Sequence, residues 1–134
     1  MPVDAESAKA VLDTLHRLTG ALDAGNWDLW ETCFAPTAYV DYSQAGGTAG
    51  PPSEVRQMED GLVALDLIRH LVTNAQMEER ADGSLQGHAL FMCASRGEPQ
   101  AAAALVGGRY DFIARQTSEL WLFEHLTAAI EWWV

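Results

Sequence analysis

Four polar side chains occupy positions where the surrounding strand pattern is apolar. Strand side chains alternate between two faces, so each of the four shares a face with aliphatic or aromatic neighbours. The four residues are Tyr42, His70, His88 and Tyr110. An imidazole among apolar groups can take and return a proton, and a phenol can donate a hydrogen bond to a developing oxyanion. The alternative interpretation is packing, with histidines that bond to backbone carbonyls and tyrosine hydroxyls that reach water.

A carboxylate is also expected on an apolar surface. At about 100° per residue, the eleven steps from Leu12 to Asp23 make three turns plus roughly 20°, so Asp23 continues the apolar stripe of its helix. A buried carboxylate is costly unless it is paired, and a histidine is its natural partner. We therefore expect Asp23 and His70 to form a pair. The alternative is a carboxylate at the helix end that remains partly in solvent.

Helical patterns fill the first half of the chain and must position Asp23. Asp4 and Gly25 are the expected caps of a long first helix. A short second helix with Trp27 and Trp30 on one side is expected to end at Pro36, and a strand should follow over 37–42. A glycine- and proline-rich loop comes next. Ser53 is then expected to cap a third helix, with an apolar stripe of Val55, Met58, Leu62 and Leu65.

From residue 67 onward the apolar period changes to two. This pattern predicts four long strands over 68–77, 85–95, 101–115 and 120–130. Helices followed by consecutive antiparallel strands are typical of an α+β fold, and 134 residues are enough for a single domain. We expect a cone in which the N-terminal helices pack in a strongly curved, mostly antiparallel sheet around a pocket.

Composition excludes several classes of function. The net charge of −11 disfavours binding to nucleic acid or to anionic membranes. No apolar run is long enough to span a bilayer, the N-terminus does not resemble a secretory signal, and the two cysteines lack metal or redox spacing. We therefore expect a cytoplasmic protein. No ligand spacing or phosphate-binding motif indicates a metal or a nucleotide, so we expect no cofactor.

Three segments resemble a known family. The stretch 26–42 has the skeleton Trp-Asp, Cys, Ala-Pro-Thr and a terminal Asp-Tyr, as in scytalone dehydratase. The segment 69–74 is similar to that family's strand with the catalytic histidine, and 106–110 is similar to a Gly-Gly-x-Tyr strand of SnoaL-like proteins. The resemblance runs from about Leu12 to Trp132 and implies the α+β cone of the nuclear-transport-factor-two-like superfamily.

The resemblance also implies roles for individual residues. His70 matches the histidine that acts as general base and acid, Asp23 matches the carboxylate that orients it, and Tyr42 matches one of two tyrosines that act on the substrate carbonyl through water. The second tyrosine position is Leu22 in this chain, a second histidine falls near Ala94, and an asparagine falls near Tyr110. About half of the dehydratase machinery is therefore present, which is closer to a generic SnoaL-like site.

We expect an enzyme that removes a proton next to a carbonyl of a cyclic, polyketide-like or other hydrophobic molecule. The outcome would be loss of water, double-bond migration or ring closure, with His70, Asp23 and Tyr42 as catalytic residues. The expected substrate-binding residues are Leu18, Leu22, Met58, His88, Met92 and Tyr110. A binding module of the same fold and a domain used only for assembly are alternatives. A one-residue shift of register would bring Asp41 into the site.

An apolar outer sheet face predicts assembly. Its expected members are Leu71, Phe91, Ile113, Leu120 and Leu122. A soluble monomer rarely exposes so much contiguous apolar surface. We therefore expect a homodimer or homotrimer that associates through the sheet.

Overall fold

The computed structural model describes residues 1–58 and 65–134. The elements follow in the order α1 (Ala5–Ala24), α2 (Trp27–Glu31), β1 (Phe34–Asp41), η1 (Ser43–Ala45), β2 (Ala49–Gly50), α3 (Pro52–Val55), η2 (Arg56–Met58), β3 (Leu67–Glu79), β4 (Leu85–Arg96), β5 (Ala104–Thr117) and β6 (Leu120–Trp133). Among these residues, no helix is both long and apolar enough to cross a bilayer.

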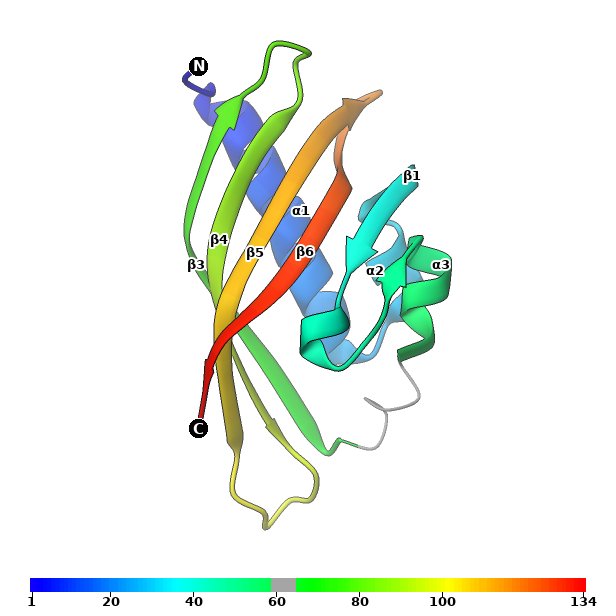
Figure 1. Cartoon of the computed structure of the whole chain (residues 1–134), viewed down its shortest axis with the longest axis vertical. Helices are drawn as coiled ribbons and strands as arrows, with labels where there is room; N and C mark the ends of the chain where they lie inside the picture. Colours follow the sequence, from blue (N-terminus) through cyan, green and yellow to red (C-terminus); the bar gives the residue numbers. More distant parts are fainter. Residues whose placement is uncertain (59–64) are drawn as a thin grey trace.

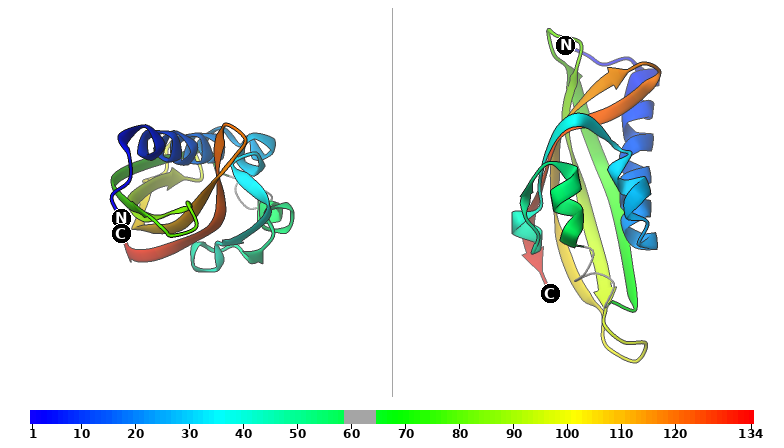
Figure 2. Two further views of the ribbon diagram at one scale, coloured as in Figure 1. Left: turned by 90° about the horizontal axis from the view of Figure 1, so that it is seen from above. Right: turned by 90° about the vertical axis from the view of Figure 1, so that its right-hand side faces the viewer.

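The strands form one curved sheet in the order β2-β1-β6-β5-β4-β3. Strands β1 and β6 are parallel, and every other neighbouring pair is antiparallel. Figure 1 shows α1 behind the long strands, with β1, α2 and α3 grouped beyond β6. Seen from above in Figure 2, the sheet curls around the helical side of the molecule. The predicted α+β cone is confirmed, and its sheet is open rather than closed into a barrel.

Helix α1 has the caps that the sequence predicts. The Asp4 side chain accepts a hydrogen bond from the Ser7 backbone N–H at 2.8 Å. Gly25 adopts a left-handed φ of 66°, and its N–H donates to carbonyls of the last turn. The face that packs against the sheet consists of Val11, Thr14, Leu15, Leu18, Thr19, Ala21 and Leu22, all of them buried. This stripe ends next to Asp23 and so directs the last turn toward the sheet.

The second helix is shorter than predicted. It ends at Glu31, and the chain is already extended at Phe34, so the expectation of a helix as far as Pro36 is wrong. Backbone pairing with β6 begins there, because the Phe123 N–H donates to the Cys33 carbonyl at 2.9 Å. The β1–β6 ladder is irregular between Phe34 and Tyr39, which gives Pro36 a place in the strand where no donor is needed.

The third helix also differs from its prediction. It begins at Pro52, so Ser53 is not its cap, and it tightens into η2 after Val55. Of the other stripe residues, Met58 lies at the end of η2, Leu62 lies outside the described residues and Leu65 is not helical. The loop before it contains η1 and the two-residue strand β2, which pairs with the end of β1.

The inner face of β4 is offset by one residue from the prediction. Phe91 and Cys93 are buried against the core, whereas Leu90 is 39% exposed on the other face. His88 and Met92 share that outer face with Leu90, so their prediction as inward residues is wrong. Both faces of β4 carry apolar side chains, which is why alternation alone did not identify the buried one. In β5, Tyr110 and Phe112 are buried as predicted.

Two adjacent glycines allow β6 to approach β5 closely. A Cβ atom on Gly108 would lie 1.9 Å from the Ala129 carbonyl oxygen. A Cβ atom on Gly107 would lie 1.9 Å from the indole of Trp132, which is partly exposed. The ladder shifts its register between these two glycines. A side chain at position 108 would therefore collide with the backbone of β6, whereas a side chain at position 107 would collide with the Trp132 side chain.

This difference predicts unequal effects of two alanine substitutions. Gly108→Ala should lower the free energy of unfolding by about 3 kcal/mol, because the obstacle is backbone. Gly107→Ala should lower it by less than about 1 kcal/mol, because the Trp132 side chain can rotate into solvent. Urea unfolding followed by circular dichroism measures both values. Equal losses would contradict this account of the pair.

Candidate active site

The Asp23 carboxylate and the His70 imidazole form a close pair between α1 and β3. His70 Nδ1 lies 2.6 Å from Asp23 Oδ1. The second carboxylate oxygen accepts a hydrogen bond from the His70 backbone N–H at 3.0 Å. The side chains are only 8% and 19% exposed, for His70 and Asp23 respectively. The predicted pairing is confirmed, and both oxygens of one carboxylate are committed to one residue.

This geometry determines which nitrogen of His70 is basic. An ionised carboxylate only accepts hydrogen bonds, so Nδ1 carries the proton that faces Asp23. The lone pair of the neutral ring is then on Nε2. Because His70 lines the adjoining cavity, Nε2 is the atom that a bound molecule can reach. A base held in one tautomer by a buried carboxylate is the arrangement that general acid–base catalysis uses.

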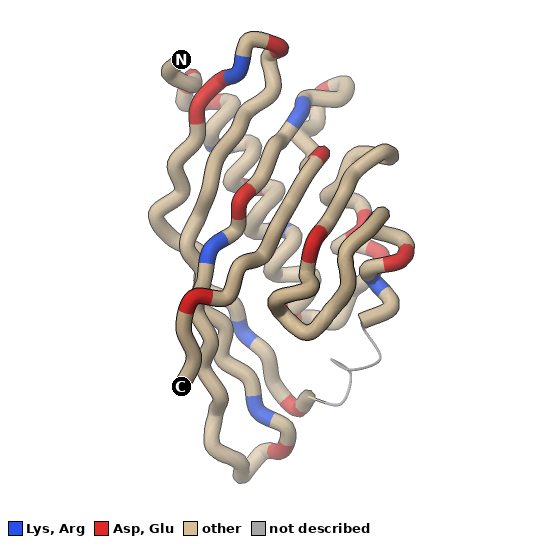
Figure 3. The backbone as a smooth tube through the Cα atoms, viewed as in Figure 1, with Lys and Arg blue, Asp and Glu red and all other residues tan. Residues whose placement is uncertain are grey.

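A cavity of about 300 Å³ adjoins the pair, a volume suited to a small organic molecule. It lies between the end of α1, the η1 and η2 turns and the inner faces of β3–β6. Its lining residues are Leu22, Tyr42, Gln44, Ala45, Met58, Leu65, Ile68, His70, Phe91, Cys93, Ser95, Val106, Tyr110, Ala128, Ile130 and Trp133. None of these described lining residues is charged at neutral pH when His70 is neutral. The acidic positions instead spread along the whole molecule (Figure 3).

Two tyrosines, Tyr42 and Tyr110, line the cavity. Tyr42 precedes η1, and its oxygen lies 3.4 Å from Nε1 of the buried Trp30. Tyr110 comes from β5, and its ring stacks on Phe91 with centroids 4.5 Å apart. Burial raises the pKa of both phenols above the usual value, so both keep their protons at neutral pH. Protonated phenols can donate hydrogen bonds to an oxygen of a bound molecule.

The two cysteines are free and buried thiols. Cys93 lines the cavity and is the cross-strand neighbour of His70. Burial raises its pKa to about 11, and the nearby Asp23 charge adds to this rise. Burial also raises the pKa of Cys33. Both groups are therefore thiols rather than nucleophilic thiolates at neutral pH.

Several predicted site residues lie away from the cavity. Leu18 is fully buried in the core and does not line it. His88 and Met92 lie on the outer face of β4, with His88 paired across the strands with Asp111. In residues 1–58 and 65–134, no group of three or more metal-binding side chains is arranged around a common point.

Asp41 also stays outside the cavity. Its Oδ1 atom accepts hydrogen bonds from the Ser43 backbone at 2.9 Å and from the Ser43 hydroxyl at 2.6 Å. These bonds hold the pKa of Asp41 below its usual value. Asp41 therefore stabilises the turn after β1, and Tyr42 is the residue of the Asp-Tyr strand end that faces the cavity.

Gln44 and Trp133 are cavity residues that the sequence did not indicate. The Gln44 Oε1 atom accepts a hydrogen bond from the Ile130 backbone N–H at 3.2 Å, which leaves its amide N–H groups available. Trp133 is 75% exposed at the C-terminal end of β6, yet its side chain borders the cavity. A polar turn and a strand end carry no periodic signal, so neither could be found from the pattern of apolar residues.

Comparison with known proteins places this fold among small α+β proteins. A family model described as a SnoaL-like domain matches residues 3–127. A comparison with curated protein sequences gave no match. A solved structure described as a candidate scytalone dehydratase from Novosphingobium aromaticivorans has a TM-score of 0.83 and 12% identity, over 94% of this chain and 85% of that chain.

Two further structures show the same architecture. The hexachlorocyclohexane dehydrochlorinase LinA-type3 from Novosphingobium barchaimii has a TM-score of 0.80 and 14% identity, over 96% of this chain and 89% of that chain. Aln2 from a Streptomyces species has a TM-score of 0.81 and 15% identity, over 97% of this chain and 94% of that chain. At these identities, the likeness to solved structures concerns the fold.

The Asp23–His70 geometry predicts the tautomer of one histidine. When the His70 imidazole ring is neutral, ¹⁵N NMR should show a protonated Nδ1 and an unprotonated Nε2. Asp23→Ala removes the acceptor and should shift the population toward the Nε2-protonated form. His125, which bonds to Thr127 on the outer face at 3.1 Å, should keep its spectrum in the variant. An unchanged His70 tautomer in Asp23→Ala would contradict the assigned role of the carboxylate.

Proposed function

Since the chain belongs to the SnoaL-like domain family, we propose that it is a lyase or isomerase of small hydrophobic carbonyl compounds, with polyketide-like ring compounds as the leading class. The observation that carries the proposal is the buried Asp23–His70 pair at the wall of an uncharged cavity. Its side chains would supply both the acid and the base. Ring closure by the same proton transfer is a third possible outcome.

In the proposed reaction, His70 Nε2 takes a proton from the carbon next to the substrate carbonyl. The electron pair of the broken C–H bond forms a carbon–carbon double bond, and charge develops on the carbonyl oxygen. The Asp23 carboxylate stabilises the imidazolium that results. For elimination, the enolate electrons expel a leaving group from the neighbouring carbon, and the imidazolium protonates that group. For isomerisation, the imidazolium protonates another carbon of the conjugated enolate. For ring closure, the enolate carbon attacks a second carbonyl carbon of the same molecule, and the imidazolium protonates the alkoxide that results.

The Tyr42 hydroxyl is the proposed donor to the developing oxyanion, directly or through water. Tyr110 is a second phenol in the same wall and would help to bind the substrate. Hydrogen bonds to a developing charge are strengthened where water is excluded, and these rings exclude it. Leu22, which stands where scytalone dehydratase has its second tyrosine, contributes only an apolar surface. We therefore expect a substrate other than scytalone.

Two of the similar structures favour elimination among these outcomes. One is named as a dehydratase, an enzyme that removes water, and another is named as a dehydrochlorinase, an enzyme that removes hydrogen chloride. Both reactions need a base that removes a proton from one carbon and a leaving group on the adjacent carbon. The Asp23–His70 pair supplies such a base, and an apolar cavity tolerates different leaving groups.

The alternative is a binding module that holds a hydrophobic molecule without turnover. It is favoured by the incomplete dehydratase machinery, in which Leu22 replaces a hydroxyl group. The two functions differ in whether His70 matters beyond its volume. For either function we propose a cytoplasmic location, because both cysteines are free thiols.

Proton abstraction predicts coupled losses of activity. With a cyclic ketone that has acidic α-protons, His70→Ala and Asp23→Asn should each slow solvent deuterium incorporation about 10²–10⁴-fold. The double variant should be little worse than the slower single variant, because the two residues act as one unit. His88→Ala, which changes a histidine on the outer face, is the matched control and should retain activity.

Two results would contradict an acid–base role. Multiplicative losses in the double variant would mean that Asp23 and His70 act independently. Full exchange activity in both single variants, with intact ligand binding, would favour the binding module.

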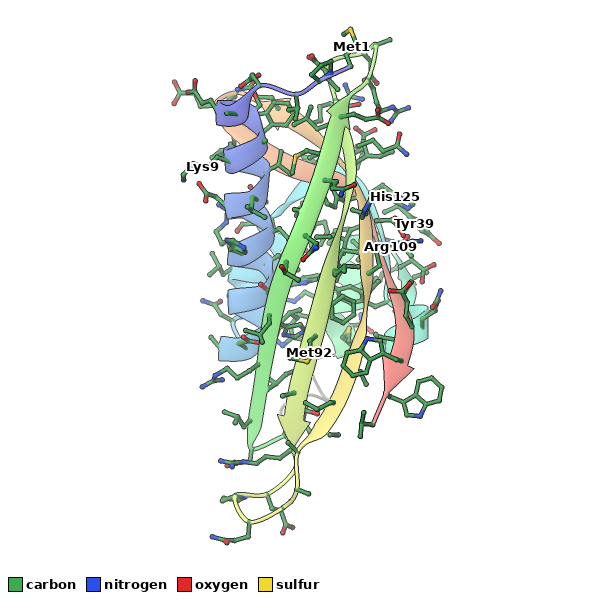
Figure 4. The ribbon with its side chains drawn as sticks, turned by 90° about the vertical axis from the view of Figure 1, so that its left-hand side faces the viewer. Met1, Lys9, Tyr39, Met92, Arg109 and His125 are labelled. Atoms are coloured by element: carbon green, nitrogen blue, oxygen red, sulfur yellow. The ribbon has the colours of Figure 1, made fainter. Side chains whose placement is uncertain are left out.

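The outer sheet face is proposed as the surface for association of two or three copies. Leu71 is 62% exposed and lies in register with Met92 and, through Gly107, with the partly exposed Trp132. Tyr39, Arg109 and His125 also lie on the side of the sheet away from α1 (Figure 4). Phe91, predicted for this face, is buried inside, and Leu120 lies at the end of the β5–β6 hairpin.

This surface predicts a homodimer or homotrimer that charge can disrupt. Leu71→Lys combined with Leu90→Lys should shift the assembly toward monomer by at least tenfold in dissociation constant, because charged groups would be buried. Leu29→Lys, on the exposed side of α2, should have no such effect. Sedimentation velocity across the micromolar range measures both. A monomeric wild-type protein over that range would contradict assembly.

A further inference from the structure

Trp30 makes a polar contact that its packing role does not require. It is fully buried, and its ring packs against Trp27, Phe34 and Tyr42 at centroid distances of 5.2, 4.7 and 5.9 Å. A phenylalanine or leucine could contribute apolar volume at this position. The indole edge, however, places Nε1 at 3.4 Å from the Tyr42 hydroxyl oxygen. The polar edge of the ring is thus directed at a residue that lines the cavity.

The chemistry of the two groups determines the direction of this hydrogen bond. An indole N–H can only donate, so the Tyr42 oxygen is the acceptor. The single proton of the hydroxyl must then be directed to another group. Within residues 1–58 and 65–134, the contact with Trp30 is the only hydrogen bond that the Tyr42 hydroxyl makes. Because Tyr42 lines the cavity, the open direction is the cavity itself.

We propose that Trp30 is a positioning residue that fixes Tyr42 as a hydrogen-bond donor toward an acceptor oxygen of the bound molecule. The chemical use of that donor, stabilisation of an enolate, rests on the proposed function. The binding geometry does not, because any molecule with a carbonyl oxygen at this place would be selected in the same way. The ligand class is therefore an uncharged ring compound with a carbonyl oxygen.

Two further observations support this arrangement. Burial raises the pKa of Tyr42, and the Trp30 N–H opposes part of that rise, which makes the hydroxyl a stronger donor. Gln44 shows the same division of roles, because the Ile130 N–H occupies its oxygen and leaves its amide hydrogens free. At both residues the protein occupies the acceptor and leaves a donor for the ligand.

The test compares two ligands that differ by one oxygen. 1-Tetralone carries a carbonyl group on a bicyclic ring, and tetralin has the same ring without it. Calorimetry should measure both affinities in the wild type, Trp30→Phe, Tyr42→Phe and the double variant. Trp27→Phe is the matched control, because it removes an indole from the same cluster but does not line the cavity. The carbonyl stretching frequency of bound 1-tetralone gives a second readout.

Trp30→Phe should weaken 1-tetralone binding about 3–10-fold and change tetralin binding by less than about 2-fold, as expected for one neutral hydrogen bond. In the Tyr42→Phe background, Trp30→Phe should have no further effect. The carbonyl frequency should rise in both single variants, because the hydrogen bond is weakened or lost. Trp27→Phe should leave the ratio of the two affinities and the frequency unchanged.

The proposal is overturned if Trp30→Phe weakens tetralin as much as 1-tetralone, or if it acts equally with and without the Tyr42 hydroxyl. Either result would give Trp30 a packing role alone. Failure of the wild type to bind 1-tetralone more tightly than tetralin would also overturn it. The expected binding pattern in a protein without exchange activity would instead refute the proposed reaction and leave the role of Trp30 standing.

Discussion

The rest of the site depends on one carboxylate that uses both of its oxygens on one residue. Asp23 binds the ring and the backbone N–H of His70, and so joins the last turn of α1 to the edge strand β3. A buried carboxylate without partners would destabilise the fold by several kcal/mol, so the pair also constrains how the helix lies on the sheet. The same contact leaves the Nε2 lone pair as the basic atom of the cavity. The Asp23–His70 contact therefore fixes both the packing of α1 on β3 and the tautomer of His70.

The polar residues of the cavity wall differ in which of their hydrogen-bonding groups already have a partner within the protein. In the part of the chain that the structure describes, His70 Nε2 has no hydrogen-bond partner, while the Tyr42 and Gln44 oxygens each accept a hydrogen bond from an N–H group of the protein. At these three residues a ligand therefore meets one base and two groups that can only donate. A molecule with an acidic C–H bond next to a carbonyl oxygen complements both. This complementarity is stronger evidence for a reaction class than the fold, which hosts many functions.

The sequence predicted those parts of the structure that depend on period and on the cost of burial. The apolar stripe of α1 placed Asp23 inward, and the need of a buried carboxylate for a partner pointed to His70. The inner face of β4 could not be predicted, because His88, Leu90 and Met92 form a pattern as regular as that of the buried set with Phe91 and Cys93. Only packing against the other strands distinguishes the two faces.

Local exceptions were also beyond the sequence pattern. Pro36 reads as a helix stop, but an irregular ladder gives it a place within β1. Gln44 is held at the cavity by a hydrogen bond from the Ile130 backbone N–H near the irregular end of β6. These two residues lie far apart in the chain, so the sequence pattern does not indicate the contact. The Gly107–Gly108 pair was correctly placed in a strand, but its reason, a close approach of β6, needs the partner strand.

The charge distribution narrows the substrate further. The chain carries a net charge of −11, and none of the described cavity-lining residues is a lysine or an arginine. The segment 59–64 adds no basic residue to the sequence. An anionic ligand would therefore enter against the overall field and lose its hydration without gaining an ionic partner. A neutral molecule avoids both costs, and its only charge would develop at the carbonyl oxygen, where the Tyr42 hydroxyl is available. The net negative charge and the uncharged character of the described cavity-lining residues thus both favour a neutral ligand over an anionic one.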